Sequence, residues 1–231
     1  MDLDIAQFVY QLSVWAIPVI FAITLHEAAH GYAAWKLGDD TAYQRGRVSF
    51  NPLRHIDPFG TILLPAILLI GSSGSFMFGY AKPVPVAFHL LRRPRTDMVW
   101  VALAGPATNL ALAYAAAVVF HLVPVFPGSF VAWITQMLSV MVFFNLLLAV
   151  FNMLPLPPLD GGRVAVGLLP NSLAFPLARL ERYGFLILVG VMFIVPFIGS
   201  EFGIDLNFFA WVLLPIVEVL RDILIVLAGH S

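Results

Sequence analysis

Two histidines and a carboxylate lie close together in a stretch of this chain that otherwise carries no charge. They are His26, Glu27 and His30, in the sequence LHEAAH. No Asp, Glu, Lys or Arg occurs from Ile5 to Leu25, so this stretch is long and apolar enough to predict a helix that crosses a membrane. Charged side chains at membrane depth are costly and usually face a partner or a hydrated cavity. The three residues therefore mark a candidate functional site.

The spacing of the three residues indicates a metal site. Histidines four positions apart lie on one face of a helix, where both rings can reach the same metal ion. Glu27 lies beside that face, close enough to accept a proton from water at the metal. A His-Glu-x-x-His pattern on a helix is typical of metalloproteases. For this segment alone, two other interpretations stay open: the histidines could bind haem, or they could form hydrogen bonds between helices.

Asp160 is the candidate third ligand. A catalytic zinc ion needs three protein ligands and one open position, and the chain has no cysteine to supply a thiolate. Asp160 is the first charged residue after the uncharged stretch Met98–Leu159, and it stands in the sequence NMLPLPPLDGG. The prolines end the helix and the glycines allow close approach, so Asp160 can point back toward the other helices. The alternative interpretation is an aspartate that forms a turn at the membrane surface.

The composition is that of an integral membrane protein. Of the 231 residues, 61% are hydrophobic and 11% are charged, against about 25% charged in soluble domains, and the mean hydropathy is +0.93. A net charge of −1 argues against a nucleic-acid partner. The first residues are acidic and lack the positive region of a signal peptide, so we expect the first span to be retained.

The uncharged stretches predict an all-α polytopic membrane protein with about five to six transmembrane helices and a short re-entrant or β-hairpin segment. We expect one integral membrane domain over 1–231, with a core at 5–165 and additional spans at about 183–228. Within it, residues 59–71 are short for a span and either cross the membrane or re-enter. The sequence FMFGYAKPVPV, at 76–86, contains Pro83 and Pro85, which exclude a helix and favour an extended strand or hairpin.

The distribution of basic residues predicts the orientation. Lys and Arg cluster at 36–54, 82–95, 163 and 179–182, and the loops at 122–130 and 199–205 have none. The positive-inside rule then places the N-terminus outside and these clusters in the cytoplasm. His26 and His30 would lie about 15 Å and 9 Å before Lys36 along the helix axis, at about 1.5 Å per residue. The site is therefore expected in the cytoplasmic half of the membrane.

HEAAH and NMLPLPPLDGG together resemble the site-2 protease family of intramembrane zinc metalloproteases. That family has H-E-x-x-H on one transmembrane helix and N-x-x-P-x-x-x-x-D-G at another. The segments NPLRHIDPFGT, FGYAKPVPV and AGPATN agree in their order, so the resemblance covers roughly residues 20–165. It implies that His26, His30 and Asp160 bind one Zn²⁺ and that Glu27 is the general base. Larger members carry a PDZ or a CBS domain, and neither fits in this chain.

The expected function is zinc-dependent hydrolysis of transmembrane substrates in or near the cytoplasmic half of the bilayer, in a prokaryotic plasma membrane. The partners would be a transmembrane protein substrate and the lipid bilayer. The alternative is a membrane metal-binding protein without catalysis, either a pseudoprotease or a cation transporter. A transporter should carry acidic or histidine residues on several helices, and a pseudoprotease would have lost Glu27.

Four further residues are candidates for supporting the site or binding substrate. Asn109 and Asn152 are amides in apolar spans, where they either bond between helices or, as the family resemblance favours, support the site. Phe78 and Tyr80 lie in the extended segment, whose backbone could hold an unwound substrate by strand addition.

Overall fold

The structure is a computed structural model that describes residues 5–63, 67 and 82–230. Every regular element in these ranges is helical, which confirms the all-α class for the described part of the chain. The elements, with η for short 3₁₀ and π segments, are α1 (Ile5–Lys36), α2 (Thr41–Gln44), η1 (Pro52–Arg54), η2 (Pro58–Leu63), η3 (Phe88–Leu90), α4 (Pro94–Val119), η4 (Phe120–Val125), α5 (Gly128–Asn152), α6 (Asp160–Leu168), α7 (Asn171–Arg179), α8 (Glu181–Val189), η5 (Gly190–Ile194), α9 (Val195–Glu201), η6 (Phe209–Leu213) and α10 (Leu214–Leu227).

Four helices in the described ranges are long and apolar enough to cross a membrane. They are Val9–Lys36, Pro94–Val125, Gly128–Asn152 and Glu181–Glu201, and all four match spans expected from the sequence. The protein is therefore an integral membrane protein. The last expected span corresponds to η6 and α10, a helical stretch that carries Glu218, Arg221 and Asp222. It is not among the four.

The expected re-entrant segment and hairpin fall only partly within the described residues. Pro58–Leu63 forms a single π-helical stretch, and residues 82–87 have no helix or strand. The remainder of that region, with Phe78 and Tyr80, lies outside the described residues.

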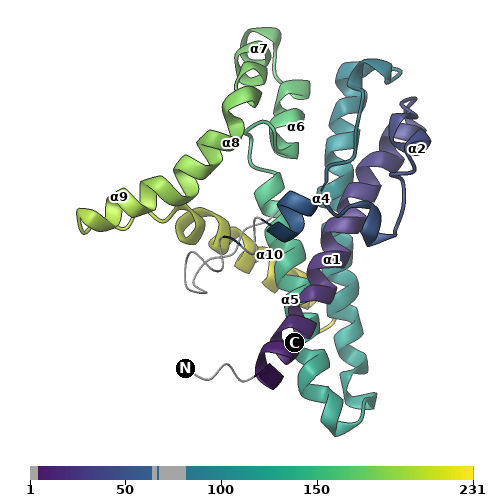
Figure 1. The fold of residues 1–231 in the computed structure, drawn as a ribbon, viewed down its shortest axis with the longest axis vertical. Helices are drawn as coiled ribbons and strands as arrows, with labels where there is room; N and C mark the ends of the chain where they lie inside the picture. Colours follow the sequence, from purple (N-terminus) through teal and green to yellow (C-terminus); the bar gives the residue numbers. More distant parts are fainter. Residues whose placement is uncertain (1–4, 64–66, 68–81, 231) are drawn as a thin grey trace.

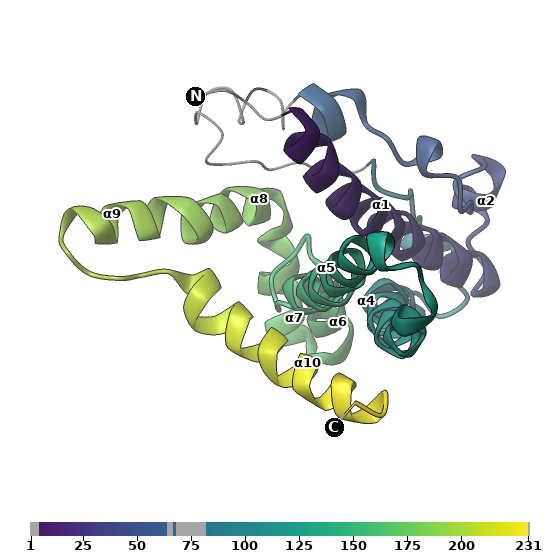
Figure 2. The same ribbon diagram turned by 90° about the horizontal axis from the view of Figure 1, so that it is seen from below.

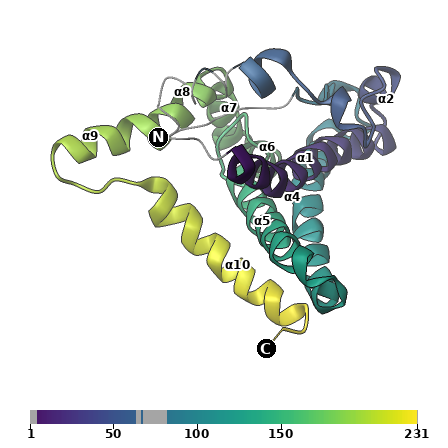
Figure 3. The same ribbon diagram turned by 60° about the horizontal axis from the view of Figure 1, so that its bottom comes forward.

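Helices α1, α4 and α5 form the group that positions the candidate site. They pack against one another along much of their length, and α6 docks on α4 near its beginning (Figure 1). The main hydrophobic cluster joins α4, α5 and α10 through residues such as Ala113, Leu146 and Val217. Figures 2 and 3 show the continuous helix from α8 to α9 leading away from this group, and α10 returning to α5.

Candidate metal centre

Three ligand atoms from two distant parts of the chain meet at one point. The Nε2 atoms of His26 and His30 are 3.0 Å apart, and each lies 3.3 Å from Oδ2 of Asp160. All three residues are buried, with at most 8% of each exposed. The structure thus brings together the two histidines of α1 and the aspartate that begins α6.

The opposite nitrogen of each ring is held by an acceptor on α4. Nδ1 of His30 donates to the carbonyl oxygen of Val101 at 2.7 Å, and Nδ1 of His26 donates to Oδ1 of Asn109 at 2.6 Å. Because each Nδ1 carries a proton, each Nε2 is the atom left to bind a metal ion. Such outer hydrogen bonds fix the ring orientation and tautomer of metal-binding histidines.

A chain of amides fixes the direction of the bond to His26. Asn145 on α5 donates to the carbonyl of Met141 at 2.8 Å, which leaves its Oδ1 as an acceptor for Asn109 Nδ2 at 2.9 Å. Asn109 also donates to the carbonyl of Ala22 at 3.2 Å. With both amide protons of Asn109 engaged, only its Oδ1 faces His26. Since Asn109 and Asn145 are both fully buried, water does not compete with this network.

Two glycines allow Asp160 to approach the histidines. After α5 ends, the chain turns back through the proline-rich loop 153–159, and α6 begins directly against that loop. A Cβ on Gly161 would lie 2.2 Å from the carbonyl oxygen of Met153, and one on Gly162 would lie 2.2 Å from the nitrogen of Pro157. Any larger residue would push the start of α6, and Asp160 with it, away from the loop.

The surroundings of Asp160 favour its charged form, the form that binds a metal ion. Burial raises the pKa of a carboxyl group, but the neighbouring His26 and His30 outweigh burial and hold the pKa of Asp160 well below its ordinary value. Its Oδ2 is nevertheless buried without a hydrogen-bond partner. A buried carboxylate oxygen in that position is costly unless a cation or a proton on the facing rings compensates it.

These residues fit a zinc ion. In a tetrahedral site with ligands at about 2.0–2.1 Å, neighbouring ligand atoms are separated by about 3.3 Å. The three separations of 3.0, 3.3 and 3.3 Å are close to that value. Two imidazoles and a carboxylate are a typical catalytic zinc set. A haem pair is excluded, because the two Nε2 atoms face one point and cannot lie on opposite sides of a porphyrin.

Gly105 on α4 closes the site over the histidine rings. A Cβ at this position would lie 2.4 Å from Nε2 of His30 and 2.5 Å from Cε1 of His26. The backbone of α4 therefore packs directly on both rings, and this contact belongs to the AGPATN segment.

Glu27 lies outside the cluster of ligand atoms and is half-buried. Its Oε2 accepts a hydrogen bond of 2.6 Å from the backbone N–H of Val84. Val84 belongs to the irregular segment 82–87, so the structure joins Glu27 to the described end of the FGYAKPVPV motif.

The other predicted residues differ in where they lie. Asn109 is directly bonded to a ligand, whereas Asn152 donates to the carbonyl of Leu148 within its own helix, at 2.9 Å. Phe78 and Tyr80 lie outside the described residues. Sequence reasoning missed Asn145 and the packing role of Gly105. Asn145 is an amide in an uncharged span, the same signal that singled out Asn109 and Asn152.

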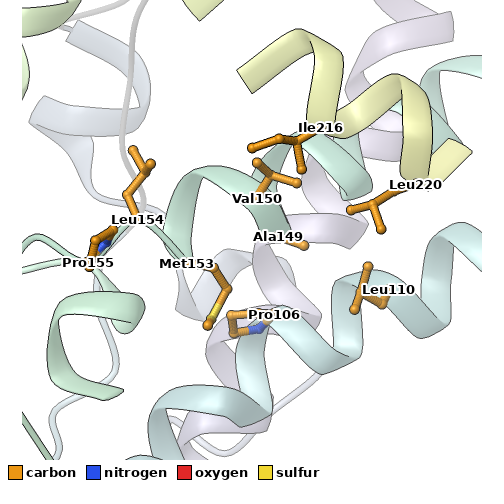
Figure 4. A pocket seen from close by; sticks show the side chains of 9 residues that line it. All are labelled: Pro106, Leu110, Ala149, Val150, Met153, Leu154, Pro155, Ile216 and Leu220. Atoms are coloured by element: carbon orange, nitrogen blue, oxygen red, sulfur yellow. The ribbon is translucent and has the colours of Figure 1, made fainter. Parts of the chain in front are cut away.

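An apolar pocket of about 380 Å³ opens beside the centre (Figure 4). It lies between α4, α5, α10 and the loop that leads to Asp160, and it includes Pro106, the neighbour of Gly105. Its other lining residues are Leu110, Ala149, Val150, Met153, Leu154, Pro155, Ile216 and Leu220. Apolar surface thus borders the metal centre on the side of α10.

Asn145→Leu is expected to weaken zinc binding by about 10–100-fold, the usual cost of removing an outer-shell partner of a metal ligand. Leucine is similar in size, but it cannot accept the bond from Asn109, so the amide that holds His26 loses its fixed direction. A competition titration with a chromophoric zinc chelator measures the affinity.

Asn152→Leu is the matched control for Asn145→Leu. Both amides lie on α5, and both donate to the carbonyl four residues earlier. Only Asn145 is connected to His26, through its hydrogen bond with Asn109. Zinc affinity should therefore stay at the native value in Asn152→Leu. Equal affinities in the two variants would show that the amide chain does not support the metal.

Comparisons with known proteins identify the family of this chain. Residues 121–196 match the model of Peptidase family M50. A protein of Bacillus subtilis named as a candidate zinc metalloprotease, YwhC, is 40% identical over 188 residues, which are 80% of this chain and 81% of that protein. Rip2 of Mycolicibacterium smegmatis, also named as a candidate zinc metalloprotease, is 33% identical over 79% of this chain and 67% of its own length. No solved structure gives a significant match.

The identity to YwhC extends over most of both chains, and the family model covers residues 121–196, a range that includes Asp160 but not the histidines of α1. The relatives that this chain matches are named as zinc metalloproteases, which favours the protease over the cation-transporter and non-catalytic interpretations of the sequence. The chain is a zinc metalloendopeptidase of peptidase family M50, the site-2 protease family.

Proposed function

We propose that this protein cleaves transmembrane proteins in the cytoplasmic half of the bilayer, with His26, His30 and Asp160 as zinc ligands and Glu27 as the general base. The observation that carries the proposal is the meeting of three ligand atoms within 3.3 Å of one another, two of them on α1, a helix that is apolar enough to cross a membrane. A metal site on such a helix favours substrates that enter from the lipid.

The protein's own residues account for the acid–base steps. A zinc ion bound by such ligands acidifies water and polarises a peptide carbonyl. Glu27 holds its Oε2 on the N–H of Val84, which leaves Oε1 to take the proton from the attacking water. Glu27 then returns that proton to the nitrogen of the leaving amine, the second half of general acid–base catalysis. Asn109 keeps His26 in one orientation throughout.

The cytoplasmic location follows from the charges around the site. Lys36 ends α1, and Arg92, Arg93 and Arg95 precede or begin α4, so basic residues flank both helices at the end nearest His30. The positive-inside rule assigns that end to the cytoplasm. The N-terminal end of α1 would then be external. The relatives that the chain matches in Bacillus subtilis and Mycolicibacterium smegmatis support the plasma membrane of a prokaryote.

The direct test is cleavage of a membrane-embedded substrate. The purified protein is reconstituted in lipid vesicles with single-span proteins, and the products are mapped by mass spectrometry. We expect cuts within the span or at its cytoplasmic edge, with loss of cleavage after treatment with a zinc chelator and recovery when zinc is restored. The same sequences supplied as water-soluble fragments should be cut far more slowly.

Two outcomes would contradict the proposal. Cleavage only in segments well outside the membrane would show that the protein does not cut within the bilayer. It would then be a membrane-bound protease that cuts exposed loops. Cuts confined to the external half of the span would reverse the proposed orientation.

A further inference from the structure

The carboxylate of Glu27 accepts a hydrogen bond from a backbone N–H, and the segment that carries this N–H is itself held by several hydrogen bonds. The N–H of Val84 donates to Oε2 of Glu27 at 2.6 Å. The side chain of Val84 is 8% exposed and lies against α1 at Gly31, one helical turn beyond Glu27. Val84 therefore contacts the same helix face twice, once through its backbone and once through its side chain.

Arg47 fastens the beginning of this segment. Its guanidinium donates to the carbonyl oxygens of Lys82 at 2.6 Å and Pro83 at 3.3 Å, and also to the carbonyl of Arg54. These are the two carbonyls immediately before the N–H that reaches Glu27. Since a guanidinium is a rigid planar fork with several donors, it can fix neighbouring carbonyls in one arrangement.

Two further hydrogen bonds hold the segment at its ends. The N–H of Lys82 donates to the carbonyl of His55 at 2.9 Å, and the N–H of Ala87 donates to Oδ2 of Asp39 at 2.6 Å. Asp39 is fully buried, so water does not compete for that bond. The segment is thus fixed on both sides of Val84.

We propose that Arg47 is a positioning residue for catalysis: it holds segment 82–84 so that the N–H of Val84 fixes the general base Glu27 in its working orientation. This inference rests on the proposed role of Glu27. A carboxylate on a flexible side chain loses rate when it is free to rotate, because a displacement of about 1 Å from the reacting atoms can cost about 100-fold in rate. The bond from Val84 removes that freedom and leaves the other carboxylate oxygen available.

Val84→Pro is the sharpest test, because it removes one N–H and little else. Proline lacks the donor and is close to valine in size. Val84 already precedes Pro85, so its backbone is biased toward the extended region, part of which proline can adopt. We expect kcat to fall about 100-fold while KM and zinc content stay native.

Val86→Pro is the matched control. Each valine follows a proline, so both substitutions create a Pro-Pro pair and place the same new restriction on the preceding proline. Within the described residues, the N–H of Val86 has no acceptor, and Val86→Pro should retain native kcat. Val84→Ala, which keeps the N–H and shortens the side chain, separates the loss of packing from the loss of the donor.

Arg47 is tested in the same assay. Arg47→Ala should lower kcat about tenfold without a change in KM or zinc content, since the segment keeps its bonds to His55 and Asp39 but loses its hold next to Val84. Arg47→Lys, which can reach one carbonyl at a time, should recover part of the loss. A thermal melt in lipid vesicles checks that each variant is folded.

The outcomes separate this inference from the proposed function. If Glu27→Gln is inactive and Val84→Pro is as active as the native protein, Arg47 and Val84 do not position Glu27. The assignment of Glu27 as the general base is then unaffected. If Val84→Pro raises KM and leaves kcat unchanged, the segment binds substrate and does not position Glu27. If Glu27→Gln is itself active, Glu27 is not the general base, and the inference that rests on this role fails with it.

Discussion

Protein carrying Glu27→Gln is expected to bind one zinc ion per chain, as the native protein does, and to cleave its substrate about 10²–10⁴-fold more slowly, the usual contribution of a general base. Glutamine has nearly the shape of glutamate and can still accept the bond from the N–H of Val84 through its carbonyl oxygen. It cannot take a proton from water. Metal content by elemental analysis and single-turnover cleavage in vesicles measure the two properties separately.

Asp160→Ala provides the contrast. This variant removes one of three ligand atoms, and both zinc content and cleavage should be lost together. An active Glu27→Gln protein would show that another group accepts the proton. Full zinc occupancy in Asp160→Ala would instead remove Asp160 from the ligand set, although its Oδ2 lies 3.3 Å from both histidine nitrogens.

The helices could be predicted because membrane insertion constrains the sequence strongly. Hydrocarbon excludes charged residues and requires helical backbone, so the charge-free stretches correspond closely to α1, α4 and α5. The loop expected at 122–130 corresponds to the end of η4, the two residues that follow it and the start of α5. The same reasoning is weaker toward the C-terminus, where Glu218, Arg221 and Asp222 interrupt the apolar pattern of α10.

The meeting of the three candidate ligands could be expected from the sequence, but the contacts that hold them could not. His26 and His30 have a helical spacing, and Asp160 stands out by its charge after a long apolar stretch. The acceptor for His30, in contrast, is the backbone carbonyl of Val101, which no residue type reveals. The donor to Glu27 is likewise a backbone N–H, that of Val84. Backbone groups are the same in every residue except proline, so only the fold shows which of them reach the site.

Glycine packing is a second kind of information that the sequence conceals. In Gly105, Gly161 and Gly162 the missing side chain is what matters, because each allows a close approach of backbone or ring atoms. Gly190 and Gly128 look no different in the sequence, yet a Cβ on either would meet nothing within 4 Å. The structure therefore distinguishes glycines that position the metal centre from those that do not.

Gly105→Ala is accordingly expected to reduce zinc content from about one ion per chain to nearly none. The new methyl carbon would lie 2.4 Å from Nε2 of His30 and 2.5 Å from Cε1 of His26, far inside the normal contact distance of about 3.5–4.0 Å. The rings cannot simply move aside, because the Nδ1 atom of each is bonded to α4 itself, through Val101 and Asn109. A shift of α4 would instead break those same bonds.

Gly190→Ala is the control, since Gly190 is also helical and its added methyl group meets nothing within 4 Å. Alanine favours a helix over glycine by up to about 1 kcal/mol, so this variant should fold at least as well as the native protein and keep its zinc. Metal analysis and a thermal melt of both variants make the comparison. Native zinc content in Gly105→Ala would mean that α4 does not rest on the two rings. Loss of zinc in Gly105→Ala but not in Gly190→Ala, with the helices of both variants still folded, would show that one methyl group on α4 is enough to separate the ligands.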